Sequence, residues 1–179
     1  MCGVLCYLSQ IRHYLTEDAT KLLVTTLVLS RLNYCSVVWA GIGKTDVHKL
    51  QKMVNFAARV IYCKRKSEHV TPLLKNLNWL TVENKLRFDT MVLMYRVAHC
   101  TAPGCVTALF RYVHETSMRT TRQSRDFYEP MGRTEAGRRT VAYRGSRLWN
   151  NLPRSLRDAP SLSSFKRQLR SRLLNQQWS

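Results

Sequence analysis

The stretch KTDVHKLQKMVNFAARVIYCKRK, residues 44–66, decides the fold. Its apolar side chains recur every three or four residues, which in a helix places them on one side: Val47, Leu50, Met53, Val54, Ala57, Ala58 and Ile61. The opposite side carries Lys49, Lys52 and Arg59. We therefore expect an amphipathic helix, capped by Thr45, whose apolar side packs on a core and whose cations face outward.

Similar spacing predicts further helices over most of residues 1–112. The segment from Thr16, a candidate N-cap, to Gly41 is apolar on most faces between Leu22 and Leu32, which favours a central position in a bundle. Further helices are expected over 4–15, from Thr71 and Pro72 onward, from Thr81 to about Cys100, and after Pro103. The sequence thus predicts a mainly α protein in which residues 1–112 form a helical bundle.

The composition changes near His114, and we expect residues 113–179 to form a basic C-terminal extension packed on that bundle. The runs RDFYEPM (125–131) and RRTVAYR (138–144) could form a short β-hairpin around the glycine-bearing turn between them. The stretch SLSSFKRQLRSRLL (161–174) predicts a terminal amphipathic helix. Its thin apolar stripe is Leu162, Phe165, Leu169 and Leu173.

The stretch RLWNNLP (147–153) has two interpretations. In the first, Arg147 contacts a phosphate and Trp149 is a stacking platform for a base of a single strand. In the second, Leu148, Trp149 and Leu152 form a hydrophobic plug, while Asn150 and Asn151 hydrogen-bond the turn. Large aromatic side chains are mostly buried, so the second interpretation is favoured.

The charge balance points to a polyanion. The chain holds 29 Lys and Arg against 11 Asp and Glu, a formal net charge of +18. From Arg111 onward the cations are all Arg except Lys166, and arginine offers a flat fork of donors that fits phosphates and base edges. Nucleic acid is the first expected partner and an acidic membrane surface the second, with a merely solvated basic surface as the alternative.

The candidate nucleic-acid-binding residues are the cations of the amphipathic helices and of the basic runs beside them. They are Lys49, Lys52, Arg59, Lys64, Arg65, Lys66, Arg138, Arg139, Arg144, Arg147, Lys166, Arg167, Arg170 and Arg172.

No catalytic, cofactor or metal motif is present in the sequence. Its single adjacent acidic pair, Glu17 and Asp18, is explained by the dipole of a helix start, and no phosphate-binding loop or nucleophile motif occurs. The clustered soft ligands His99, Cys100 and Cys105 fall short of the four that structural zinc takes. We expect no cofactor, no small-molecule ligand, no metal and no membrane partner, and a binding module in place of an enzyme.

Localisation is expected to be intracellular, in the nucleus or the cytoplasm. The first residues lack the basic start of a secretory signal, and the longest apolar run, LLVTTLVL (22–29), is too short to cross a bilayer. The six cysteines form no CxxC motif, so we expect them to be small buried hydrophobes in a reducing compartment.

Four segments together are similar to a known family. They are SRLNYCSVVWAG (30–41), LQKMVNFAARVI (50–61), HVTPLLKNLNWLTVENKLRFDTMVLMYRVAHCTAP (69–103) and RLWNNLPRSLRDAPSLSSFKRQLRSRLL (147–174). In this order and at similar intervals, they resemble the C-terminal region of reverse transcriptases of non-LTR (LINE-type) retrotransposons, the jockey and chicken-repeat groups in particular. The resemblance covers nearly the whole chain.

The resemblance implies the thumb and post-polymerase region of an RNA-directed DNA polymerase encoded by a transposable element. Its partners would be template–primer RNA or DNA and the palm and fingers of the parent enzyme. The paired aspartates of the palm do not occur in this sequence, so no catalytic residue is assigned and Met1 would begin a truncated copy or partial gene. Two alternatives remain. The fragment could be a structural remnant or interaction module without dedicated nucleic-acid binding, or the terminal helix could bind a membrane or a calmodulin-like groove.

Overall fold

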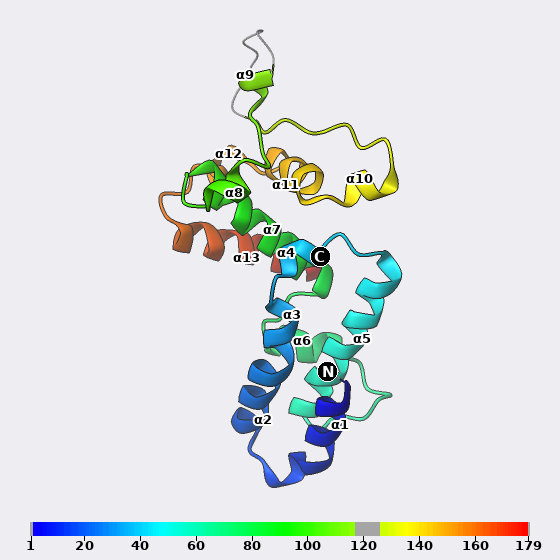
Figure 1. Ribbon diagram of the computed structural model, residues 1–179. Helices are drawn as coiled ribbons and strands as arrows, with labels where there is room; N and C mark the ends of the chain where they lie inside the picture. The colour runs from blue at the N-terminus through cyan, green and yellow to red at the C-terminus, as the bar shows by residue number, and fades with distance from the viewer. Residues whose placement is uncertain (1, 117–125, 179) are drawn as a thin grey trace. The chain divides into compact units, whose positions relative to one another are not determined.

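The computed structural model describes residues 2–116 and 126–178, and within them the chain is mainly α-helical (Figure 1). Its contacts define two compact units. The N-terminal unit comprises Met1–Ser36 and Ile42–Glu83, and the C-terminal unit comprises Val37–Gly41 and Asn84–Ser179. Contacts therefore group residues 84–112 with the C-terminal segment, whereas the domain boundary after residue 112 stays a prediction from composition.

The N-terminal unit is built from helices that pack on α5 (Lys44–Ile61), the amphipathic helix expected from the sequence. Both α1 (Cys2–Ile11) and α2 (Glu17–Val24) contact α5 (Figure 1). The 3₁₀ turn Arg12–Tyr14 joins these two helices, and α6 (Thr71–Asn76) follows α5. Its core is formed by Leu5, Leu8, Val24, Val28, Leu32, Val54, Ala57, Ala58, Val60, Ile61, Leu73, Leu74, Leu77, Leu80 and Val82.

The buried side of α5 confirms the predicted stripe, but the predicted cap is wrong. Val54, Ala57, Ala58 and Ile61 are buried. The other three residues of the stripe, toward the start of the helix, are half-buried. The N-cap is Gly43, whose carbonyl accepts the N–H groups of Asp46 and Val47 at 3.0 and 3.1 Å, so Thr45 already lies inside the helix. Glycine is itself a favourable N-cap, and it leaves the threonine hydroxyl without a capping role.

The helix expected between Thr16 and Gly41 is interrupted. Thr16 caps α2 as predicted, because its hydroxyl accepts the N–H of Ala19 at 3.3 Å. A π-helical turn follows at Thr25–Leu29, then α3 (Ser30–Asn33) and α4 (Ser36–Trp39). The break before α4 lies at Cys35, whose φ of 48° is left-handed. A left-handed residue cannot continue a right-handed helix.

Hydroxyl side chains surround the π-turn and account for the local distortion. Thr25 and Thr26 donate to the carbonyls of Lys21 and Leu22 at 2.7 and 2.9 Å, and such bonds bend helices. The prediction that residues 22–32 are buried on most faces is wrong for one side of the segment. Leu22 is 64% exposed and Leu27 is 43% exposed.

The C-terminal unit is organised by α7 (Val82–Ala98), whose residues from Asn84 onward belong to it, and by α13 (Leu162–Trp178). Between them lie the shorter helices α8 (Gly104–Thr107), α9 (Val113–Thr116), α10 (Glu135–Arg139), α11 (Val141–Asn150) and α12 (Arg154–Arg157) (Figure 1). The starts expected after Thr81 and Pro103 are confirmed at α7 and α8.

An aromatic cluster forms the centre of this unit. The Tyr95 ring stacks on Phe165 at 4.6 Å between centroids, and its hydroxyl donates to the Ala159 carbonyl at 2.8 Å. Trp149 lies edge-on to Tyr95 and Phe127 at 6.4 and 6.3 Å. Aromatic pairs in such geometry add to the stabilisation from buried area.

The structure confirms the plug interpretation of residues 147–153, because Trp149 is 4% exposed and Leu152 is buried. Trp149 is therefore no stacking platform for a base. The Asn150 amide does not hold the turn: its Nδ2 donates to the Phe127 carbonyl at 2.8 Å and its Oδ1 accepts the Phe127 N–H at 3.0 Å. The Asn150 side chain thus makes the two backbone hydrogen bonds of Phe127 that a neighbouring β-strand would otherwise make.

The expected hairpin is wrong, because no strand forms in residues 126–131 or 138–144. Phe127 instead makes an isolated antiparallel bridge to Tyr112. The second run is helical, since Thr134 accepts the Gly137 N–H at 3.0 Å and starts α10, and Thr140 accepts the Tyr143 N–H at 3.3 Å and starts α11. Threonine capping overrides the short apolar alternation that suggested a strand.

Five of the six cysteines contradict their expected burial, and the side chain of Cys2 lies outside what the structure describes. Cys6, Cys35, Cys63, Cys100 and Cys105 are all exposed free thiols. Within the described ranges, no helix has both the length and the apolar character needed to cross a membrane.

Candidate nucleic-acid interface

The predicted cations occur in both units, and we describe each group by itself. In the N-terminal unit, Lys49 and Lys52 project from the exposed side of α5, opposite its buried stripe. Lys49 Nζ lies 3.0 Å from Asp46 Oδ1, one turn earlier. Such an exposed pair contributes at most about 1 kcal/mol, so it can exchange for a phosphate at little expense.

The loop after α5 compensates part of its own charge through Glu68. Its carboxylate accepts the backbone N–H of Arg65 at 2.9 Å and lies 3.0 Å from the Lys64 ammonium. These two contacts, the backbone hydrogen bond first, hold the pKa of Glu68 below its usual range. Half-buried Arg59 donates from Nη2 to the Glu68 carbonyl at 3.1 Å, while Lys66 is exposed.

In the C-terminal unit, α13 presents a cationic face with no carboxylate of its own. Its apolar stripe is confirmed: Phe165, Leu169 and Leu173 are buried and Leu162 is half-buried. The remaining positions carry one half-buried cation and three exposed ones, with no Asp or Glu between residues 162 and 178. In order along the helix they are Lys166, Arg167, Arg170 and Arg172.

The cations of α13 repel one another along the helix. Arg170 follows Lys166 by four residues and Arg167 by three, the two spacings at which helical side chains are neighbours. Like charges so placed destabilise a helix by about 0.2–0.5 kcal/mol per pair. A bound anion would relieve this repulsion.

A second basic group lies on α10 and α11. Arg138 Nε donates to the Gly132 carbonyl at 2.9 Å, and Arg139 Nη2 lies 3.3 Å from Glu135 Oε1. Arg147 Nη1 contacts the Tyr143 hydroxyl at 3.4 Å. Three of the four arginines predicted here are thus exposed and oriented by local contacts.

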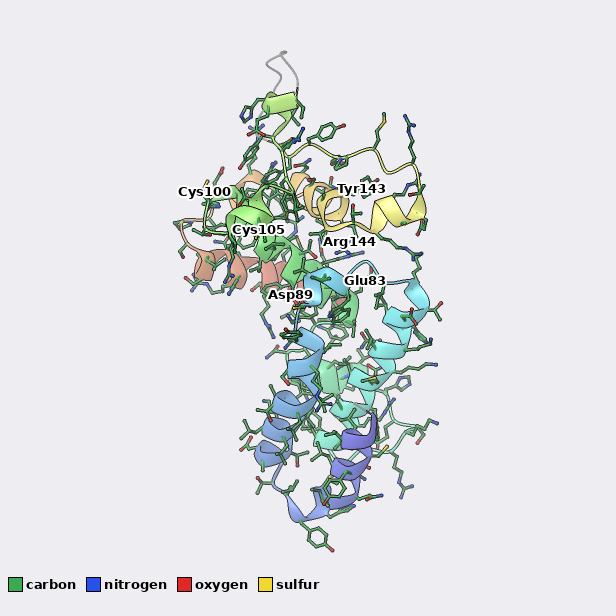
Figure 2. All side chains as sticks on the ribbon, viewed as in Figure 1. Glu83, Asp89, Cys100, Cys105, Tyr143 and Arg144 are labelled. Carbon is green, nitrogen blue, oxygen red and sulfur yellow. The ribbon has the colours of Figure 1, made fainter. Side chains whose placement is uncertain are left out.

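Arg144, labelled in Figure 2, differs from the other three arginines of this group because it is half-buried whereas they are exposed. Its Nη2 donates to the hydroxyl of fully buried Thr90 on α7 at 3.2 Å, and its Nη1 donates to the Arg139 carbonyl at 3.5 Å. Burial lowers the pKa of this guanidinium, although arginine remains charged throughout the neutral range. The side chain is therefore a fixed, partly desolvated cation.

The carbonyl that receives Arg144 is itself fixed. The Cα of Gly41 packs so closely on the Arg139 carbonyl that a Cβ at residue 41 would overlap it. Sequence reasoning missed Gly41 and Thr90 as supports of the basic group. They lie far from residue 144 in the chain, and neither carries a signal of its own.

Sequence reasoning also missed the ion pair between Arg157 and Asp126, whose Nη1 and Oδ1 atoms lie 2.6 Å apart. Both side chains are largely buried, with exposed fractions of 16% and 22%. In the part of the chain that the structure describes, no three His, Cys, Asp or Glu side chains converge as metal ligands.

Comparison with known proteins adds no family to this description. No protein-family model, no curated protein and no solved structure matches the chain.

Proposed function

We propose that this chain is a nucleic-acid-binding module that grips RNA or DNA through phosphates. The observation that carries the proposal is the cationic face of α13, where Arg167, Arg170 and Arg172 are exposed on a helix without a carboxylate. The buried stripe of α13 anchors the helix in the aromatic core, so the arginines are presented by a rigid element. Preorganised donors lose less entropy when they bind.

We further propose that the module is the thumb and post-polymerase region of a non-LTR retrotransposon reverse transcriptase. The support is the ordered succession of the four sequence segments together with the mainly helical fold. Template–primer duplex would be the ligand, and the palm and fingers of the parent polymerase would supply catalysis. We assign no catalytic residue to this chain, and place its binding activity inside the cell, in the nucleus or the cytoplasm.

The test is fluorescence anisotropy of labelled RNA, DNA and hybrid duplexes with a triple variant of α13. We expect Arg167→Gln, Arg170→Gln and Arg172→Gln together to reduce the slope of log K against log salt by about 2–3, since each phosphate contact contributes about 0.9 on duplex DNA. The matched control removes three exposed cations elsewhere: Lys21→Gln, Arg31→Gln and Arg96→Gln. Equal losses in both variants would show diffuse attraction to net charge and contradict the proposal.

A second candidate function, protein–protein interaction, is favoured by one observation. The N-terminal unit exposes four large apolar or aromatic side chains besides Leu27. They are Tyr7, Tyr14, Leu22 and Tyr34. Where such side chains form a contiguous patch, they often mark a contact site. Sedimentation analysis of the chain with and without Leu22→Lys tests it: association that the variant abolishes supports interaction, and a monomer in both samples excludes self-association.

A further inference from the structure

Arg144 is a half-buried guanidinium whose hydrogen-bond partners are neutral. Its two hydrogen bonds go to the Thr90 hydroxyl and to the Arg139 carbonyl. Burying a charge without a counter-ion is unfavourable, and proteins usually pair such groups. This unit follows that rule elsewhere, because largely buried Arg157 is paired with the Asp126 carboxylate at 2.6 Å. The contrast indicates that Arg144 lacks an anionic partner among the described residues of its own unit.

Arg144 has N–H donors left to bind such a partner. A guanidinium carries five N–H groups, and the two hydrogen bonds of Arg144 use one on each terminal nitrogen. Both acceptors are fixed: the Thr90 hydroxyl is fully buried and itself donates to the Leu86 carbonyl at 2.8 Å, and the Arg139 carbonyl packs on Gly41. The remaining N–H groups are therefore held in one orientation, as bidentate recognition of a phosphate requires.

A second cation lies at helical spacing from the first. Arg147 follows Arg144 by three residues on α11, so the two side chains emerge from neighbouring positions of the same helix. Arg147 is exposed, and its Nη1 contacts the Tyr143 hydroxyl at 3.4 Å. Residues 133–150 contain five arginines and one acid, Glu135, which pairs with Arg139. The surroundings of Arg144 are therefore strongly positive.

We propose that Arg144, assisted by Arg147, forms a phosphate anchor, a fixed site on α11 for one phosphate group of a bound nucleic acid. The proposal deepens the proposed function and rests on it for the identity of the ligand. Exposed cations such as Arg167 can contact the nucleic-acid backbone at many positions. The half-buried guanidinium of Arg144, by contrast, would hold one phosphate in one place. Arg144 would thus set the register of the nucleic acid on the C-terminal unit, as phosphate contacts do elsewhere.

The first experiment uses inorganic phosphate and the full chain. Arginine Nε–Hε signals are followed by NMR while phosphate replaces chloride at constant ionic strength. In the wild-type chain we expect the Arg144 and Arg147 signals to shift saturably. In Arg144→Lys, which keeps the charge but loses the fork, we expect the phosphate affinity measured from the Arg147 signal to fall about tenfold. The matched control, Arg96→Lys, changes an exposed arginine of α7 and should leave the Arg144 response unchanged.

A purely structural role for Arg144 predicts a different result. If Arg144 merely ties α11 to Thr90, its signal will drift linearly with phosphate, like those of the other arginines, and the anchor is overturned. The wild-type titration decides this even if Arg144→Lys folds poorly, because the signal can be assigned through the backbone.

The same variants separate the anchor from the proposed function. In anisotropy titrations we expect Arg144→Lys to weaken RNA or DNA binding about tenfold, and Arg96→Lys to leave it unchanged. The wild-type chain could bind phosphate saturably while Arg144→Lys binds nucleic acid as tightly as wild type. That result would overturn the assignment of the bound phosphate to a nucleic acid. If the wild-type chain binds nucleic acid no better than an unrelated protein of equal charge, the proposed function fails, while the NMR titration still decides whether Arg144 binds phosphate.

Discussion

Gly145 illustrates how a single residue sets the packing of the C-terminal unit. A Cβ built there would lie 2.7 Å from the sulfur of Met94 and 3.1 Å from a ring carbon of Phe110. Met94 is fully buried, so its side chain has little room to move. Glycine in the middle of a helix costs about 1 kcal/mol in helix propensity. At residue 145 it allows α11 to approach Met94 of α7 closely.

We predict that Gly145→Ala destabilises the chain by about 1–2 kcal/mol, because overpacking outweighs the gain in helix propensity. Urea unfolding followed by circular dichroism measures the change. Gly104→Ala is the matched control, since a Cβ at Gly104 meets nothing within 4 Å. A Gly145→Ala variant as stable as wild type would show that the Met94 contact relaxes freely.

Single residues differ in how well the sequence predicts them. Trp149 was predictable, because a large aromatic beside leucines is usually buried. The role of Asn150 was not, since its amide bonds the backbone of Phe127, and no local pattern specifies a partner 23 residues away. The hydrogen bond from Arg144 to the Thr90 hydroxyl could not be predicted for the same reason, because the two residues are 54 positions apart in the sequence. The cations of the candidate site could be read from the sequence, but their supports could not.

Among the elements, the two amphipathic helices α5 and α13 followed from their apolar spacing, because each buries one side against a core. The helical structure of residues 135–144 was missed. Caps at Thr134 and Thr140 start α10 and α11 where alternation suggested a hairpin. The π-turn and left-handed Cys35 divide a segment whose apolar composition suggested one continuous helix.

The stripe of α13 should dominate the stability of the C-terminal unit. Phe165 is fully buried and contacts both Tyr95 and Trp149, so Phe165→Ala is expected to destabilise the chain by about 3–5 kcal/mol. Gln168→Ala, on the exposed side of the same helix, should stay within about 0.5 kcal/mol of wild type. Thermal unfolding of both variants tests this, and equal melting temperatures would contradict the packing of α13.

The loop after α5 should respond to pH through Glu68. Since the pKa of Glu68 is lowered in the folded state, its contribution to stability is present above the pKa of the unfolded state and is lost as pH falls through the folded value. We expect Glu68→Gln to be less stable than wild type at pH 7 and the difference to shrink toward pH 3. Melting temperatures across this range measure it, and a difference independent of pH would exclude the contacts to Arg65 and Lys64 as its source.

At the scale of the whole molecule, charge and packing have separate roles. Apolar stripes build the two units, and the chain as a whole carries a formal net charge of +18, which favours association with polyanions. Two cations with acidic partners are Arg157, which pairs with Asp126, and Lys64, which pairs with Glu68. Helix α13 carries three exposed arginines. Helical class and charge could be predicted from composition and periodicity. The grouping of α7 with α13 could not, because it depends on contacts between distant residues.

The most direct test of the central claim is the affinity of the wild-type chain for a hybrid duplex as a function of salt. We predict log K falling linearly with log salt, with a slope of about −3 or steeper, little dependence on base sequence, and affinity well above that of an unrelated protein of equal charge. A flat salt dependence, or affinity no greater than that of the charge-matched protein, would contradict the claim that this chain binds nucleic acid through its arginines.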